Sequence, residues 1–341
     1  MTRVVPNERL YTPSIERLPT RPLGNSGIDV SELALGSWRT YERISREQGL
    51  SVMLAAREYG VTFLDDARYN DETGLAPMAT GYSEVVFGEL FRAAGWRRDE
   101  TVVANKLWWE FWPDQSASEE LEGSLRRMGF DYVDLVYSFS APQGPSIAEI
   151  VAAVGELIAS GKARAWGTAN WQPADHAQAA AIATDLRVLP PCAAQLPYSL
   201  VHRDFVESQP ATEALERSGS GVVASYVLAG GVLSGKYDDR ATGGRMRELL
   251  DDPDIVDERI ASELRELESS LRFVPALRAL AAELATTPAA LAIAFALANE
   301  RVSSVLFGAT TPAQVTENIA AAELFARSIG TQLDRLRALT V

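Results

Sequence analysis

Short apolar runs alternate with amphipathic helical windows along this 341-residue chain, and that alternation limits the possible folds most strongly. Strict alternation of strands and helices predicts a parallel sheet with helices packed against it. Eight such units over about 300 residues match a closed (β/α)8 TIM barrel, which makes residues 1–341 a single α/β domain. The predicted strands are 33–37, 61–65, 101–107, 132–138, 163–169, 192–198, 221–227 and 303–308.

A doubly wound open sheet is the rival architecture. It usually carries G-x-G-x-x-G after its first strand, whereas the first run here ends in LGSWR. The helical window 45–60 begins with Ser45 and Gln48, which form a predicted capping box, and Gly60 ends it. These signals favour the barrel and fix the start and end of its first helix.

No long linker rich in Pro, Gly or Ser splits the chain, which fits one domain. The stretch 237–257 is the least structured, and we expect it to be a loop insertion over one face of the barrel. Two helical windows, 312–325 and 327–339, close the chain, and residues 324–341 form a C-terminal segment.

Composition and charge narrow the class of protein. The chain is 47% hydrophobic, so it can bury a large core, and its net charge of −14 argues against nucleic acid or anionic lipid as partners. A single cysteine, Cys192, excludes an intramolecular disulfide. The two histidines, His176 and His202, argue against a zinc site, and we expect both to be structural or solvent-facing. Without a signal pattern or a long apolar run, we expect a cytoplasmic protein with no membrane span; a homo-oligomer stays open.

Lysine is rare in this chain, so each lysine is a candidate for a chemical role. Three of the 32 basic residues are lysine, namely Lys106, Lys162 and Lys236, and lysine offers an amine whose pKa burial can lower. Functional side chains of such a barrel lie at the C-terminal ends of strands, where Asp65 and Lys106 are found. Because their strands are neighbours, we expect the carboxylate and the amine to pair. Adjacent strand residues face opposite sides, so we expect Asp66 to be a loop or helix-capping residue.

Eight segments, in one order, resemble the aldo-keto reductase family over nearly the whole chain. RPLGNSGIDVSELALGSW is similar to the family opening, GVTFLDDA to its strand with F-D-T-A, and ANKL to the segment with its catalytic lysine. The later motifs have counterparts in SLRRMGFDYVDLVY, SGKARAWGTANW, AQLPYSLVHR, LAGGVLSGKY and FGATTPAQVTENI. Each motif alone is weak, but eight in the family's order are specific.

The resemblance implies that NADP(H) binds in an extended pose across the barrel mouth. Asn170 and Gln195 match residues that hold the nicotinamide carboxamide, and Lys236 matches a cation for the phosphates. We expect NADP(H) rather than NAD(H), with Arg245 of the 237–257 loop clamping the 2′-phosphate. The other predicted cofactor contacts are Gly36, Ser37, Trp38, Asp65, Ser225, Tyr226, Leu228, Ala229, Gly230, Gly308, Thr310, Gln314, Glu317 and Asn318.

The proton donor is where the chain departs from the family pattern. In the family, a tyrosine five residues after the aspartate gives a proton to the substrate, a lysine lowers its pKa, and the aspartate anchors the lysine. Counted from Asp65, that position is Asn70, and Tyr69 lies one residue earlier. Three readings stay open: Tyr69 takes the acid role after a loop shift, Tyr82 folds back to the same place, or Lys106 or a water donates the proton.

Aromatic residues crowd the segment KLWWEFWPD that follows the lysine. They cannot all face one way, so at least one should line the mouth. We expect an apolar substrate pocket formed by Trp108, Trp109, Trp112, Trp171 and Phe139. Where the family has histidine at the end of this strand, the chain has Phe139, or Ser140 if the alignment slips by one residue. The expected function is hydride transfer to a C=O, C=N or enone of an apolar or aromatic small molecule. The alternative is a catalytically weak NADPH-binding sensor resembling the potassium-channel β subunits.

Overall fold

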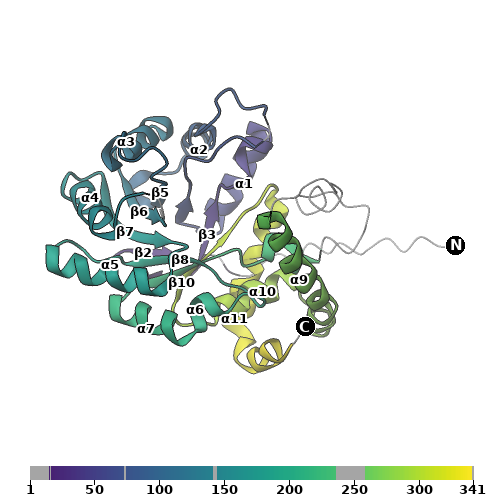
Figure 1. The fold of residues 1–341 in the computed structure, drawn as a ribbon. Helices are drawn as coiled ribbons and strands as arrows, with labels where there is room; N and C mark the ends of the chain where they lie inside the picture. Colours follow the sequence, from purple (N-terminus) through teal and green to yellow (C-terminus); the bar gives the residue numbers. More distant parts are fainter. Residues whose placement is uncertain (1–14, 16, 73, 141–143, 236–257, 340–341) are drawn as a thin grey trace.

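The computed structural model describes residues 15, 17–72, 74–140, 144–235 and 258–339, and eight parallel strands in it form a closed barrel (Figure 1). Around the barrel the order is β10-β3-β4-β5-β6-β7-β8-β9, so β10 closes the ring against β3. Each strand overlaps a predicted run, which confirms the (β/α)8 TIM barrel. The strands are β3 (Leu33–Gly36), β4 (Phe63–Asp65), β5 (Val102–Leu107), β6 (Val133–Phe139), β7 (Ala163–Ala169), β8 (Ala193–Pro197), β9 (Gly221–Ser225) and β10 (Val302–Phe307).

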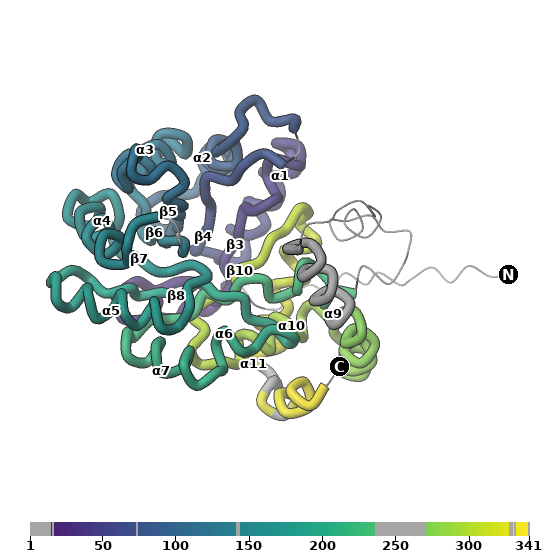
Figure 2. Tube along the Cα trace, in the orientation of Figure 1, coloured from purple at the N-terminus to yellow at the C-terminus, as the bar shows by residue number. Residues whose placement is uncertain are grey.

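Helices connect the strands and surround the barrel, and Figure 2 follows the chain from its purple N-terminal strands to the yellow C-terminal helix. Ser116 and Ser146 begin two of the helices as full capping boxes with Glu119 and Glu149. The helices are α1 (Arg46–Glu58), α2 (Tyr82–Ala93), α3 (Ala117–Met128), α4 (Ile147–Ala159), α5 (Pro173–Leu186), α6 (Asp204–Glu207), α7 (Gln209–Ser218), α9 (Glu258–Glu283), α10 (Pro288–Leu297) and α11 (Pro312–Ala338), with 3-10 turns η1 (Tyr41–Arg43), η2 (Arg98–Glu100) and η3 (Ala229–Ser234).

An antiparallel hairpin that the sequence patterns did not predict covers the N-terminal end of the barrel. It consists of β1 (Thr20–Pro22) and β2 (Asp29–Ser31), and Leu23 in its loop is fully buried with the apolar side chains inside the barrel. Gly24 has φ +51°, and a Cβ there would lie 2.2 Å from the carbonyl oxygen of Cys192, just before β8. The hairpin loop therefore packs directly on the strand starts, which leaves the C-terminal ends of the strands as the open side.

The capping of α1 differs in part from the prediction. Ser45 Oγ accepts a hydrogen bond from the Gln48 backbone N–H at 3.1 Å, and Gly60 follows the helix with φ +76°, both as predicted. The Gln48 side chain does not complete the box, because its Nε2 donates to the Thr310 carbonyl at 2.8 Å. The prediction that the Gln48 side chain completes the capping box was therefore wrong, because its amide binds a carbonyl in the loop after β10 instead.

The C-terminal part of the chain is one helix, α11, where the sequence indicated two windows. Residues 324–338 continue this helix, while the predicted loop insertion at 237–257 lies outside the described residues. In the described part of the chain, no single helix is long and apolar enough to cross a membrane. Ser270–Glu283 and Pro288–Leu297 pass that test only together, as a pair bent by 92°.

Candidate active site

Four polar side chains, from the neighbouring strands β4 and β5, from β8 and from the loop after β4, meet at the C-terminal end of the barrel. The register of β4 and β5 sets Asp65 beside the strand that carries Lys106, and the Lys106 amine donates to Asp65 Oδ1. Gln195 at the end of β8 donates from Nε2 to Asp65 Oδ2 at 2.9 Å. Tyr69, in the loop after β4, lies with its hydroxyl 3.3 Å from Lys106 Nζ. Asp65 and Lys106 are only 1% and 3% exposed, so the ion pair is shielded from water.

Tyr69, and not Asn70, faces the lysine. Asn70 is exposed and forms an isolated bridge with Thr80, which folds the following loop back on itself. The Gly81 N–H donates to the Tyr69 carbonyl at 2.8 Å and closes the same loop. The reading in which Tyr82 reaches the lysine is wrong, because Tyr82 begins α2 and its hydroxyl accepts from an arginine of α1 at 2.9 Å.

The surroundings of Tyr69 keep its hydroxyl protonated. Burial raises the pKa of Tyr69 well above its ordinary value, and the carboxylates of Asp65, Asp66, Glu42 and Glu84 raise it further. A phenol with a raised pKa carries its proton throughout the neutral range, although it gives that proton up reluctantly. The arrangement therefore offers a proton donor of low acidity beside a paired lysine.

Asp66 lies in the loop directly after β4, as predicted, but its side chain is fully buried and not open to water. Strand alternation does turn it away from Asp65, but η1 and α2 cover that side of the strand, where Ser37 donates to Asp66 Oδ1. The other oxygen, Oδ2, has no partner among the described residues. Burial, and then the nearby carboxylate of Glu84, raise the pKa of Asp66 well above its usual range. Asp66 is therefore a buried carboxyl group behind the site that, in the described part of the chain, is contacted by a hydroxyl and not by a cation.

One of the predicted pocket aromatics, Trp108, contacts Tyr69, and a second, Phe139, stacks on Trp108. The rings of Trp108 and Phe139 stack with centroids 4.3 Å apart and planes 10° apart, and Tyr69 meets Trp108 edge-on at 6.0 Å. Trp109 and Trp171 are 5% and 4% exposed and belong to the core between barrel and helices, so the prediction that they line the pocket was wrong. The half-buried Trp112 packs against Trp109, with ring centroids 5.9 Å apart.

Glu120 of α3 fixes the aromatic segment, and sequence reasoning missed it. Its Oε1 accepts from the Trp108 N–H at 2.9 Å and its Oε2 from the Trp109 N–H at 3.3 Å. Arg68 approaches the same carboxylate at 3.8 Å, and burial raises the pKa of Glu120. An acidic residue in the first turn of a helix is common, so nothing in the sequence separated Glu120 from its neighbour Glu119.

The nicotinamide end of the predicted cofactor site lies at the same open side. Asn170 follows β7 with φ +59°, is exposed, and donates from its backbone N–H to the Gln195 carbonyl at 3.0 Å. Ser225 ends β9, and Tyr226 after it is 36% exposed in a left-handed conformation. Trp38, after β3, is 46% exposed. These residues follow strands that end on the same side of the barrel as Asp65 and Lys106, where a ligand lying across the barrel mouth could contact them.

The residues predicted to contact the phosphate and adenosine ends of the cofactor lie in the loops after β9 and β10 and at the start of α11. Leu228 and Ala229 lead into the glycines Gly230 and Gly231, whose φ values of +66° and +91° let the backbone approach a ligand closely. The exposed Gly308 follows β10, and Gln314 Oε1 accepts from the Thr310 N–H at 2.7 Å at the start of α11. Glu317 is half-buried and Asn318 is 4% exposed on that helix. Lys236 and Arg245 lie outside the described residues.

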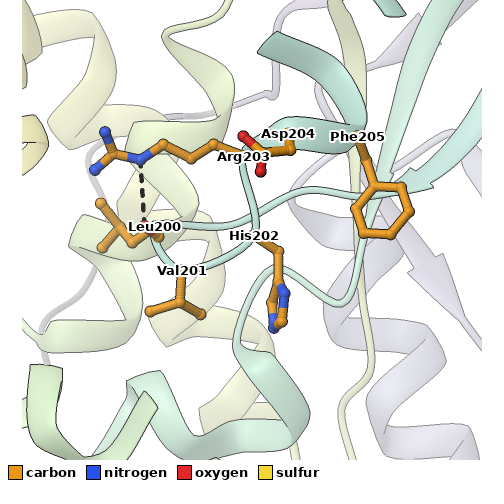
Figure 3. Close-up of a pocket in the computed structure, with 6 residues that line it drawn as sticks. All are labelled: Leu200, Val201, His202, Arg203, Asp204 and Phe205. Atoms are coloured by element: carbon orange, nitrogen blue, oxygen red, sulfur yellow. Dashed lines mark hydrogen bonds between the residues drawn. The ribbon is translucent and has the colours of Figure 1, made fainter. Parts of the chain in front are cut away.

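Both histidines lie apart from the lysine. His176 of α5 is buried, with Nδ1 2.8 Å from Thr168 Oγ1 and Nε2 3.0 Å from Ser218 Oγ, and burial lowers its pKa to about 4. His202 lies in the loop after β8, with its ring 5.9 Å from that of Tyr226. This loop borders a cavity of about 300 Å³ (Figure 3). None of the residues that line it is a predicted site residue: they are Leu200, Val201, His202, Arg203, Asp204 and Phe205. In the described ranges, no group of three or more His, Cys, Asp or Glu side chains is placed to hold a metal ion.

Comparison with known proteins agrees with this geometry. The model of the aldo/keto reductase family matches residues 32–335. A relative from Oryza sativa subsp. japonica, named as a probable voltage-gated potassium channel subunit beta, is 32% identical over 328 residues, which cover 93% of this chain and 95% of the relative. Both matches take in the barrel strands and the residues at their C-terminal ends. The chain therefore belongs to the aldo/keto reductase family.

Proposed function

We propose that this chain is an NADP(H)-dependent oxidoreductase that reduces a C=O or C=N bond of an apolar or aromatic small molecule. One observation carries the proposal: the Tyr69 hydroxyl lies 3.3 Å from the amine of Lys106, which is itself paired with buried Asp65. Membership of the aldo/keto reductase family supports an oxidoreductase, and such proteins typically bind NADP(H). The ring of Trp108, which meets Tyr69 edge-on and stacks on Phe139, supports an apolar substrate.

The residues at the mouth fit a nicotinamide cofactor. Asn170 presents an exposed side-chain amide next to Gln195, and the left-handed turn at Gly230 gives a close backbone approach on the same side of the barrel. Asn170 and Gln195 would hold the carboxamide, and the loop after β9 would hold the phosphates. NADP(H), when bound, supplies the hydride that reduces the substrate carbon.

The protein's own groups manage the proton. As the carbon is reduced, the electron pair of the double bond moves to the oxygen or nitrogen, which takes the proton from Tyr69. Lys106, which is paired with Asp65, stabilises the phenolate that remains. Trp108 and Phe139 keep water from the reacting atoms, which strengthens these electrostatic effects. The product is an alcohol from a carbonyl or an amine from an imine.

The proposed partner is a small-molecule substrate, and the proposed compartment is the cytoplasm. A net charge of −14 supports neither nucleic acid nor an anionic membrane as a partner.

Three variants and two cofactors test the proposal. Tyr69→Phe should lower kcat for an aromatic aldehyde by about 10²- to 10⁴-fold, because a positioned proton donor contributes that much. Asn70→Ala should leave kcat nearly unchanged, since Asn70 is exposed and pairs with Thr80. A silent Tyr69→Phe together with an inactive Lys106→Met would show that the site works without the phenol. Fluorescence titration should show tighter binding of NADPH than NADH, and equal affinities would count against the cofactor assignment.

A second candidate is a catalytically weak sensor of NADPH. Two observations favour it: the rice relative is named as a channel subunit beta, and burial with four carboxylates makes Tyr69 a reluctant acid. A sensor would hold NADPH through purification and turn over no faster than it exchanges cofactor. Stopped-flow measurement of hydride transfer beside cofactor release separates the two, because rapid repeated turnover excludes the sensor.

A further inference from the structure

Arg68, the residue directly before Tyr69, is a nearly buried cation. Its side chain is 7% exposed, and its guanidinium contacts three other side chains. Nη1 donates to Thr80 Oγ1 at 2.9 Å, Nη2 donates to Glu110 Oε2 at 2.7 Å, and Nη2 lies 3.8 Å from Glu120 Oε1. Burying a charge costs free energy unless the charge is paired and hydrogen-bonded, so these contacts are what allow an arginine at this position.

One contact of Arg68 closes the loop on which Tyr69 lies. Asn70 forms a bridge with Thr80, so the two ends of this loop run side by side, and the bond from Arg68 to Thr80 ties the same ends together. The Tyr69 N–H donates to the Ala67 carbonyl at 2.8 Å, which makes a three-residue turn centred on Arg68. The direction in which the Tyr69 side chain leaves the backbone therefore depends on where Arg68 is held.

The other side of Arg68 contacts the loop after β5. Glu110 lies in that loop, and so does Phe111, whose ring centroid is 5.4 Å from Arg68 Cζ. The same loop carries Trp108, whose ring meets that of Tyr69 edge-on with 6.0 Å between centroids. Arg68 thus joins the loop that carries Tyr69 to the loop whose aromatic ring packs against it.

The Tyr69 hydroxyl depends on its loop for its position. In the part of the chain that the structure describes, it has one hydrogen-bond contact, the Lys106 amine at 3.3 Å, which is longer than a typical hydrogen bond. A contact of that length fixes a phenol weakly. The backbone on which Tyr69 stands and the ring packed against it therefore have to hold the hydroxyl in place.

We propose that Arg68 is a positioning residue, which holds the Tyr69 hydroxyl beside Lys106 for proton transfer without touching the substrate itself. The proposal rests on the proposed reductase function and goes beyond it by assigning a residue that acts through Tyr69. A guanidinium suits this role because it donates from two nitrogens in fixed directions and so binds Thr80 and Glu110 at once. A lysine ammonium is a single compact charge and lacks this fork.

Kinetics of the purified full chain with NADPH and benzaldehyde test the proposal. Arg68→Met keeps the apolar stem but removes the guanidinium, and it should lower kcat by about 10- to 100-fold, because a misplacement of about 1 Å costs up to about 10²-fold. The KM for benzaldehyde and the Kd of NADPH should stay nearly unchanged, since in this proposal Arg68 binds neither molecule. Arg68→Lys, which keeps the charge but not the fork, should recover part of the lost kcat.

The Tyr69→Phe background separates positioning from general support of the fold. Adding Arg68→Met to Tyr69→Phe should lower kcat no further, because no hydroxyl is left to position. An arginine that only stabilised the loops, or that held the cofactor, would give the same fold-loss in both backgrounds. The interaction measured in this double-mutant cycle therefore reports the proposed role directly.

A partner variant and a control complete the set. Glu110→Ala removes a partner whose side chain is 46% exposed, so the variant should fold, and it should give a smaller loss of kcat of the same kind. Its effect should vanish in the Arg68→Met background, because the link is already broken. Arg43→Met is the matched control: it removes a guanidinium 3.0 Å from Glu72 of the same loop, where Arg39 still contacts Glu72, and it should leave kcat unchanged.

The outcomes separate this inference from the proposed function. Wild-type protein that neither binds NADPH nor reduces an aldehyde overturns both. In an active wild type, Arg68→Met with full activity, or with an equal loss in the presence and absence of the Tyr69 hydroxyl, overturns the Arg68 proposal alone. If thermal unfolding shows that Arg68→Met does not fold, Arg68→Lys and Glu110→Ala are taken through the same cycle with Tyr69→Phe. An unchanged kcat in both variants, or losses that persist without the hydroxyl, then overturns the proposal.

Discussion

Replacing Asp65 with Asn should lower the free energy of unfolding by on the order of 3–5 kcal/mol, the usual cost of leaving one partner of a buried ion pair alone. Asp65 and Lys106 are 1% and 3% exposed, so water does not solvate the amine left behind. Gln195 Nε2, which donates to Asp65 Oδ2 at 2.9 Å, would still meet an amide oxygen, so the lost charge accounts for most of the effect. Urea unfolding at pH 7, followed by the fluorescence of the seven tryptophans, measures it.

Two controls isolate the charge. The double variant Asp65→Asn/Lys106→Met should lose less than the sum of the single variants, because neither charge is then stranded. Asp66→Asn should cost less than about 1 kcal/mol, because Asp66 is equally buried but its side chain accepts from the Ser37 hydroxyl, from which an amide oxygen of nearly the same shape can also accept. A loss below about 1 kcal/mol for Asp65→Asn, additive double variants, or equal losses from Asp65→Asn and Asp66→Asn would refute the reasoning.

Three further predictions concern pH and backbone strain. Because the pKa of buried His176 falls from 6.5 to about 4, the unfolded chain binds the extra proton between these values. The contribution of His176 to stability should be full above pH 6.5 and fall by about 3 kcal/mol towards pH 4, and the difference in urea midpoints between wild type and His176→Gln across this range measures it. Because the pKa of Tyr69 is raised above 10, aldehyde reduction should stay level with pH up to about 10, and a basic limb with an apparent pKa below 9 would contradict the assigned cause. Gly24→Ala should lower thermal stability more than Gly27→Ala. Both glycines are left-handed, which strains an alanine by about 1–2 kcal/mol, but only Gly24 has backbone atoms within 3 Å of the new Cβ. Equal losses in thermal unfolding would contradict the packing of the hairpin on the barrel.

The eight strands were predictable because buried parallel strands are short apolar runs bounded by turn signals. The hairpin of β1 and β2 was missed because each strand has three residues, too few to show alternation. Gln48 is well placed in the sequence for a capping box, but its side-chain partner, the Thr310 carbonyl, is brought there by the closed ring. Local sequence patterns thus predict the strands and helices, but they do not predict contacts between units that are distant in the sequence.

Within the site, the Asp65 and Lys106 pair follows from strand order, because neighbouring βα units set their strand ends side by side. Asp66 shows the limit of the same reasoning. Alternation gave its direction correctly, but whether that direction meets water or a helix depends on how α2 packs. The choice between Tyr69 and Asn70 depended on a pairing between Asn70 and Thr80 that no residue pattern announces. Trp109 and Trp171 look like pocket residues in the sequence and become core once the helices are placed.

The closure of β10 against β3 has a consequence for how the protein is made. During synthesis β3 emerges early and β10 near the end, so the outer edge of β3 has no strand partner while most of the chain is still being added. Unpaired strand edges readily pair with other chains, so the nascent chain is most prone to aggregate during this interval of synthesis. The hydrogen bond from Gln48 to Thr310, across 262 positions of sequence, forms only after that edge is covered. A ribosome that stalls before residue 302 therefore leaves a nascent chain with an open barrel and a β3 edge free to aggregate.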